Sequence, residues 1–121
     1  MNRGILVIGS NCGEREKHIT EALSLLSEVC IIEKASSVYE SPDCLGSGLQ
    51  YLNLVAAISS CMEEEDFNLT LKVIEDKCGR VKKQGSREVA IDIDIVVWGG
   101  VVRRNADFNA QYFKRGYREI F

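Results

Sequence analysis

Two aspartates stand one residue apart in an apolar segment, and their spacing implies chemistry more directly than any other feature of the chain. Residues 90–98 read AIDIDIVVW. In a β-strand, residues i and i+2 point to the same face, so we expect Asp92 and Asp94 to lie side by side. Adjacent carboxylates repel one another, and Mg²⁺ is the cation that one or two carboxylates hold together with substrate phosphates. The pattern predicts a magnesium site; the alternative is a solvated strand face that carries two acids.

The elements that must position this pair follow from the spacing of apolar residues. The β-α-β-β-α-β order of these elements is the ferredoxin-like pattern, an α+β sandwich whose antiparallel sheet has helices packed on one face. The other face is expected to be free for loops and ligands. The predicted elements are a strand at 5–8, a helix at 14–27, strands at 30–39 and 51–60, a helix at 63–78 and the aspartate strand at 90–98.

Two further segments connect or extend these elements. Residues 41–48 contain the only proline and two glycines, which predicts a long loop. Gly99 and Gly100 are expected to end the aspartate strand. The residues beyond them predict a short C-terminal extension with one hairpin strand and a terminal turn.

Length and composition narrow the class of protein. With 121 residues the chain is expected to form one domain, 1–121, and its 45% hydrophobic and 27% charged residues are ordinary for a globular protein. The net charge of −3 argues against a general nucleic-acid binder. No apolar run is long enough to predict a membrane span. Five widely spaced cysteines without a C-x-x-C pair favour a reducing compartment, so we expect a cytoplasmic protein.

Five short motifs follow one another along the chain in a particular order. They are GSN at 9–11, YESP at 39–42, YLN at 51–53, E-x-x-x-GR at 75–80 and DID at 92–94. As an ordered set they resemble the 6-hydroxymethyl-7,8-dihydropterin pyrophosphokinase family of folate biosynthesis. The resemblance implies transfer of the pyrophosphoryl group of ATP to the hydroxymethyl oxygen of 6-hydroxymethyl-7,8-dihydropterin, with release of AMP and two Mg²⁺ ions bound with ATP.

The resemblance also implies a role for individual residues. Asp92 and Asp94 would hold the Mg²⁺ ions, and Arg80 would complete the catalytic set by contacting the phosphates. The residues expected to bind the pterin substrate are Ser41, Pro42, Leu45, Tyr51, Asn53 and Tyr117. The residues expected to bind the nucleotide are Glu75, Lys82, Lys83, Ile95, Tyr112 and Arg115. On the residues alone, Tyr51 is better explained as a core aromatic, and a plain polar position near a helix end stays open for Glu75.

The chain departs from the family pattern in ways that keep other functions open. Val89 stands three residues before Asp92, where the family has an arginine, and Arg87 or Arg115 is the candidate replacement. The Pro-His motif of the family has no match, so we expect a shortened and divergent member. One alternative is a degenerate member that binds pterin or nucleotide without catalysis or acts as an interaction module. The other is a different Mg²⁺-dependent nucleotide enzyme on the same fold.

Overall fold

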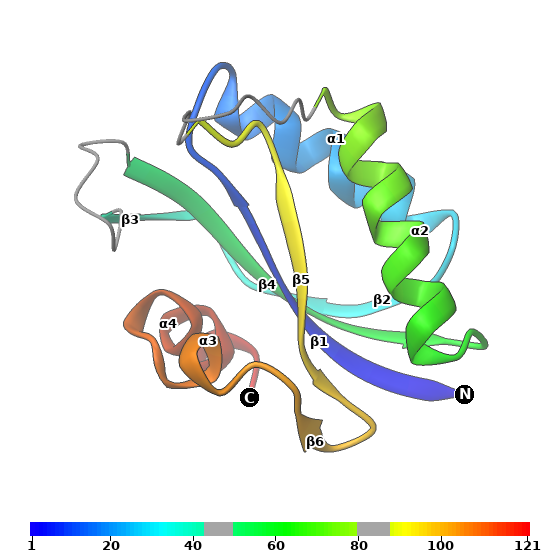
Figure 1. The fold of residues 1–121 in the computed structure, drawn as a ribbon. Helices are drawn as coiled ribbons and strands as arrows, with labels where there is room; N and C mark the ends of the chain where they lie inside the picture. The colour runs from blue at the N-terminus through cyan, green and yellow to red at the C-terminus, as the bar shows by residue number, and fades with distance from the viewer. Residues whose placement is uncertain (43–49, 80–87) are drawn as a thin grey trace.

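An antiparallel sheet forms the centre of the molecule (Figure 1). The computed structural model describes residues 1–42, 50–79 and 88–121. The strands of the sheet are β1 (Asn2–Ser10), β2 (Ile31–Ala35), β3 (Tyr39–Pro42), β4 (Gln50–Ser60), β5 (Asp92–Trp98) and β6 (Val101–Val102). They lie in the order β2-β4-β1-β5-β6, and β3 pairs with β4 beyond the end of β2. The aspartate strand β5 therefore lies directly beside the central strand β1.

Helices cover the two faces of the sheet unequally (Figure 1). The two long helices α1 (Arg15–Ser27) and α2 (Glu64–Lys77) lie on one face, as the ferredoxin-like pattern predicts. Two shorter helices, α3 (Asn105–Asn109) and α4 (Gln111–Ile120), lie against the opposite face. The α+β class and the antiparallel ferredoxin-like sheet are thus confirmed.

The two layers have separate hydrophobic cores because strand residues alternate between the faces. Leu6, Ile8 and Ile93 pack with the apolar stripes of α1 and α2. Val7 and Val55 point the other way and pack with Phe113 of α4. The apolar stripes of the long helices are Ile19, Ala22 and Leu26 in α1 and Phe67, Leu71 and Ile74 in α2.

Two predictions about connecting segments were wrong. Ser41 and Pro42, which were predicted to begin the loop 41–48, instead end the strand β3, in which Tyr39 pairs with Asn53 and Pro42 with Gln50. Proline is tolerated there because β3 is an edge strand, where one side needs no ladder hydrogen bond. The terminal turn is instead the helix pair α3 and α4. These helices cover part of the sheet face that was expected to be free.

The hairpin strand predicted after Gly99 and Gly100 is confirmed as β6. Both glycines have positive φ, 59° and 79°, the conformation that a two-residue hairpin turn requires. The turn sends the chain back along β5, and the backbone N–H groups of Arg103 and Arg104 donate to the Val96 carbonyl. The segment before α3 is therefore held beside the aspartate strand.

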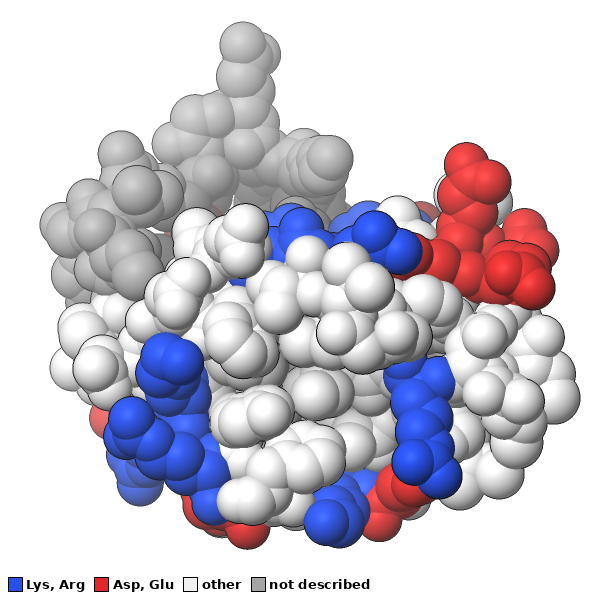
Figure 2. Space-filling view, turned by 90° about the horizontal axis from the view of Figure 1, so that it is seen from below, with Lys and Arg blue, Asp and Glu red and all other residues white. Residues whose placement is uncertain are grey.

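Figure 2 shows the molecule from below the view of Figure 1. Lys and Arg side chains lie in separate groups around a largely uncharged centre. The described part of this face therefore presents no continuous basic stripe of the kind that binds nucleic acid. None of the helices in the described ranges has the length and apolar character needed to cross a bilayer.

Candidate active site

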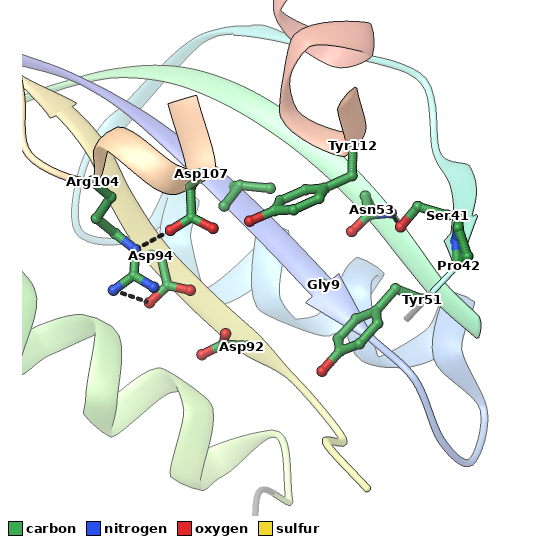
Figure 3. A pocket seen from close by; sticks show the side chains of 11 residues that line it. Gly9, Ser41, Pro42, Tyr51, Asn53, Asp92, Asp94, Arg104, Asp107 and Tyr112 are labelled. Atoms are coloured by element: carbon green, nitrogen blue, oxygen red, sulfur yellow. Dashed lines mark hydrogen bonds and ion pairs between the residues drawn. The ribbon is translucent and has the colours of Figure 1, made fainter. Parts of the chain in front are cut away.

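A cavity of about 480 Å³ lies on the sheet face that carries α3 and α4 (Figure 3). Charged side chains gather at one end of it, and tyrosine, amide and hydroxyl groups gather at the other. Its described lining consists of Val7, Gly9, Ser41, Pro42, Tyr51, Asn53, Asp92, Asp94, Arg104, Asp107 and Tyr112. Seven residues predicted from the sequence are in this set: Ser41, Pro42, Tyr51, Asn53, Asp92, Asp94 and Tyr112.

The strand β5 positions the two aspartates at the charged end. Asp92 pairs with Gly9 and Asp94 with Val7 across the β1–β5 ladder. Both carboxylates are half-buried and face the cavity, whereas Ile93 between them is completely buried toward α1 and α2. The alternation along the strand is the one that the sequence predicts.

The carboxylate pair is under electrostatic strain. Burial, followed by the hydrogen bond to Asp92 and the negative charge of Asp92, raises the pKa of Asp94 to about 7. Arg104, whose Nη1 lies 3.8 Å from Asp94 Oδ1, and Lys72 lower the pKa of Asp94 and oppose these effects only in part. Two such oxygen ligands side by side are a donor set for a hard divalent cation, which would favour the ionised form of both.

The uncharged end is built from neighbouring positions of β1, β3 and β4. The Asn53 amide nitrogen donates to Ser41 Oγ at 2.6 Å, which fixes the orientation of the side chain. Gly9 leaves room beside them, because a Cβ there would lie 3.2 Å from Tyr51 Cδ1 and 3.5 Å from Asn53 Oδ1. A ring, an amide and a hydroxyl thus meet at one wall, where they can contact a flat polar heterocycle.

Tyr112 reaches the cavity from α4, and Tyr39 fixes the position of that helix. The Tyr39 hydroxyl donates to the Tyr112 carbonyl and accepts from the Gly116 N–H at 3.1 Å. A Cβ on Gly116 would lie 2.5 Å from Val55 Cγ2, so the close approach of α4 to the sheet requires glycine. Burial raises the pKa of Tyr39 to about 12, which keeps the hydroxyl protonated as a donor.

A second cavity of about 470 Å³ lies on the other side of β5, next to α2. Ile95, which the resemblance places near the nucleotide base, is part of its lining. The described lining consists of Glu64, Glu65, Asn68, Lys72, Asp94, Ile95 and Arg104. The second cavity therefore adjoins the first at the aspartate strand.

Three predicted residues lie away from the described lining of both cavities. Tyr117 packs in an aromatic cluster with Phe108, Phe113 and Phe121. The Arg115 guanidinium lies over the ring of Tyr39 at 4.8 Å. Glu75 is 2% exposed, and its carboxylate accepts a hydrogen bond from the Ile93 N–H at 2.7 Å. The predicted residues Arg80, Lys82, Lys83 and Leu45 lie outside the described residues.

Arg104 and Asp107 also line this site, although they were not among the residues predicted from the sequence. Arg104 precedes α3, and its Nε donates to the Asp107 carboxylate. An arginine that follows a hairpin has no periodic pattern that would connect it to a strand ten residues earlier. The one available signal was the Gly99-Gly100 turn, which implies that the chain returns toward Asp94.

A comparison with models of known protein families shows the family to which the chain belongs. A family model described as 7,8-dihydro-6-hydroxymethylpterin-pyrophosphokinase (HPPK) matches residues 5–116. The chain belongs to the HPPK family. The match includes the aspartate strand, the hairpin and most of α4, so the C-terminal helices are part of the family domain.

Individual relatives agree with this affiliation. The 2-amino-4-hydroxy-6-hydroxymethyldihydropteridine pyrophosphokinase of Aquifex aeolicus is 38% identical over 103 residues, which cover 82% of this chain and 62% of the relative. The Bacillus subtilis protein of the same name is 27% identical over 100 residues, with coverages of 80% and 60%. The Folic acid synthesis protein FOL1 of Dictyostelium discoideum is 29% identical over 103 residues, with coverages of 84% and 16%. The chain spans less than two thirds of the length of each of these relatives.

Proposed function

We propose that this chain transfers the pyrophosphoryl group of ATP to the hydroxymethyl oxygen of 6-hydroxymethyl-7,8-dihydropterin in folate biosynthesis and releases AMP. The observation that carries the proposal is the composition of the first cavity. It combines a strained carboxylate pair, Asp92 and Asp94, with a wall of ring, amide and hydroxyl groups. Membership of the HPPK family supports the proposal.

The acceptor would occupy the uncharged end of the first cavity. Tyr51 and Tyr112 approach this space from β4 and α4, and Asn53 lies between them (Figure 3). The two tyrosine rings supply faces for a flat heterocycle, and the amide supplies paired donor and acceptor groups. In this arrangement Tyr112 belongs with the acceptor, although the resemblance assigned it to the nucleotide and assigned Tyr117 to the acceptor.

ATP would occupy the second cavity, with its base near Ile95 and its phosphates directed toward Asp94. The carboxylates of Asp92 and Asp94 fit two Mg²⁺ ions, which would supply neutralising charge to the triphosphate. Phosphoryl transfer of this kind requires positioning and positive charge rather than covalent chemistry from the protein. The roles predicted for Arg80, Lys82, Lys83 and Leu45 and a cytoplasmic location belong to the same proposal.

The test is AMP formation from ATP and Mg²⁺ with and without 6-hydroxymethyl-7,8-dihydropterin. We expect AMP only when the pterin is present, and we expect Asp92→Asn to abolish it. Asp76→Asn is the matched control, because it removes the same charge from an exposed position on α2. Pterin binding without AMP formation would instead support the degenerate binder, and activity with a different acceptor would support another nucleotide enzyme.

A further inference from the structure

Arg104 occupies a position that the proposed reaction does not yet explain. Its guanidinium lies between two carboxylates, with Nη1 3.8 Å from Asp94 Oδ1 and Nε bonded to Asp107. The Arg104 side chain is 50% exposed, whereas those of Asp94 and Asp107 are 16% and 14% exposed. The arginine is therefore the most exposed partner in this group, and a half-exposed ion pair of this kind is weak.

The two cavities meet at this arginine. Among the described residues, Asp94 and Arg104 line both cavities. A triphosphate that extends from the second cavity toward an acceptor in the first would pass beside these two side chains, because they line both cavities. The group that is transferred would therefore come within reach of the Arg104 guanidinium.

We propose that Arg104 is a catalytic residue that leaves Asp94 and binds the pyrophosphoryl group during transfer. This inference rests on the proposed function. In the resting protein the guanidinium partly neutralises the aspartate pair. Once the carboxylates bind cations, the arginine is available to the phosphate oxygens, for which its planar fork of donors is well suited.

The reaction that Arg104 would assist requires no reactant other than ATP and the acceptor. The acceptor hydroxyl oxygen forms a bond to the β-phosphorus of ATP, and the bond from that phosphorus to the oxygen bridging to the α-phosphorus breaks. AMP leaves with the bridging oxygen, the acceptor keeps the β- and γ-phosphates, and the hydroxyl proton passes to water. Negative charge moves onto the bridging oxygen as the bond breaks, so a cation held at the junction of the cavities favours the transition state.

The other described basic groups near the site have different positions. The Arg103 guanidinium pairs with Glu64 at 3.0 Å and is not in the described lining of either cavity. Lys72 is in the described lining of the second cavity but not of the first, and its Nζ lies 3.5 Å from a carboxylate oxygen of the buried Glu75. Arg115, one of the two replacements expected for the missing family arginine, lies over the Tyr39 ring.

The experiment compares Arg104→Gln and Arg104→Lys with Arg103→Gln. The control removes the same charge from the adjacent residue, whose side chain is 46% exposed. We expect Arg104→Gln to lower kcat by at least about 100-fold, given that an arginine on a transferring phosphate can contribute about 10³–10⁵. The KM for the pterin should change by less than about 3-fold, because Arg104 lies at the opposite end of the cavity from Tyr51. The kcat of Arg104→Lys should be about 10-fold higher than that of Arg104→Gln, since lysine restores the positive charge but not the planar set of donors.

Calorimetric binding supplies a readout that does not depend on turnover. Arg104→Gln should weaken binding of the α,β-methylene analogue of ATP with Mg²⁺ by about 10-fold, the equivalent of one lost charge-assisted contact. It should tighten binding of Mn²⁺ alone by a few-fold, because a positive charge has been removed from beside Asp94. A role limited to holding Asp107 and α3 predicts a lower unfolding temperature with no such opposite changes in affinity.

The failure of this inference can be distinguished from the failure of the proposed function. If the wild-type chain forms AMP and Arg104→Gln has a kcat within about 3-fold of Arg103→Gln, the catalytic role of Arg104 is wrong while the function stands. If the wild-type chain forms no pterin-dependent AMP, the proposed function fails and the inference fails with it. Opposite changes in affinity for Mn²⁺ and for the ATP analogue, together with a lowered kcat, would support it.

Discussion

Replacing Asp94 with asparagine is expected to stabilise the metal-free protein by an amount that depends on pH. Burial and the neighbouring Asp92 raise the pKa of Asp94 from 3.8 to about 7. One pKa unit corresponds to about 1.4 kcal/mol, so the shift of about three units sets an upper bound of about 4 kcal/mol. The variant also loses the weak pair with Arg104, which contributes about 0–1 kcal/mol. We therefore expect a gain of about 2–4 kcal/mol in the free energy of unfolding at pH 8.

The sign of this effect follows from the two protonation states. Near pH 4 and below, the folded protein holds Asp94 neutral, and asparagine is a close substitute for a neutral carboxyl group. As the pH rises from about 4 to 7, the unfolded chain loses the proton first and the wild type loses stability. Above pH 8 the carboxyl group is ionised in both states, so the difference between variant and wild type becomes constant.

The assay is urea unfolding of both proteins at pH 4, 6 and 8 in the presence of EDTA. Asp76→Asn on the exposed side of α2 is the control, and it should change stability by less than about 0.5 kcal/mol at each pH. An advantage of Asp94→Asn that is the same at all three pH values would refute the reasoning. An asparagine variant that is less stable than the wild type at pH 8 would refute it as well.

Three further substitutions test how the site is supported, each by urea unfolding and one of them also by the KM for the pterin. Glu75→Ala should lower the free energy of unfolding by about 2–3 kcal/mol, because it leaves the buried Ile93 N–H without its carboxylate acceptor; a loss below about 0.5 kcal/mol would contradict this. Tyr39→Phe should lower the free energy of unfolding by about 1–2 kcal/mol and raise the KM for the pterin, because it removes the hydroxyl that bridges two backbone groups of α4. An unchanged KM would show that the Tyr39 hydroxyl does not position the pterin site. Gly116→Ala should be destabilising overall, because overpacking against Val55 costs about 1–3 kcal/mol and exceeds the gain of about 1 kcal/mol in helix propensity. A more stable alanine variant would show that α4 can move away from the sheet.

The sequence predicted the aspartate strand well because its information is local. The alternation of isoleucine and aspartate has the period of a strand, and one face of β5 is fully buried, so the register was strongly constrained. The helices α1 and α2 were predicted equally well, since their apolar stripes have the period of a helix.

The C-terminal helix was not predicted because its signals conflict. Gly116 stands in the middle of α4, where glycine is unfavourable, and the apolar face consists of aromatic residues such as Phe113 and Tyr117. The close approach to Val55 that makes glycine necessary there exists only in the folded molecule.

The residues that line the site could be predicted only in part, because some of them are placed by long-range contacts. Ordered motifs identified Tyr51, Asn53 and the aspartates, which lie on strands whose facing follows from the pleat. Whether Tyr112 or Tyr117 reaches the cavity depends on the rotation of α4, which the Tyr39 hydroxyl fixes across the fold. Arg104 depends on the return of the chain after the β5–β6 hairpin. Such contacts are long-range and have no periodic pattern in the sequence.

The most direct test of the central claim follows two labels through the reaction. The chain is incubated with Mg²⁺, 6-hydroxymethyl-7,8-dihydropterin and ATP labelled with ³²P at either the β or the γ position. Pyrophosphoryl transfer predicts that both labels enter the pterin product and that one AMP appears for each product molecule. Release of ADP with only the γ label on the pterin, or AMP formation without any label on the pterin, would contradict the account.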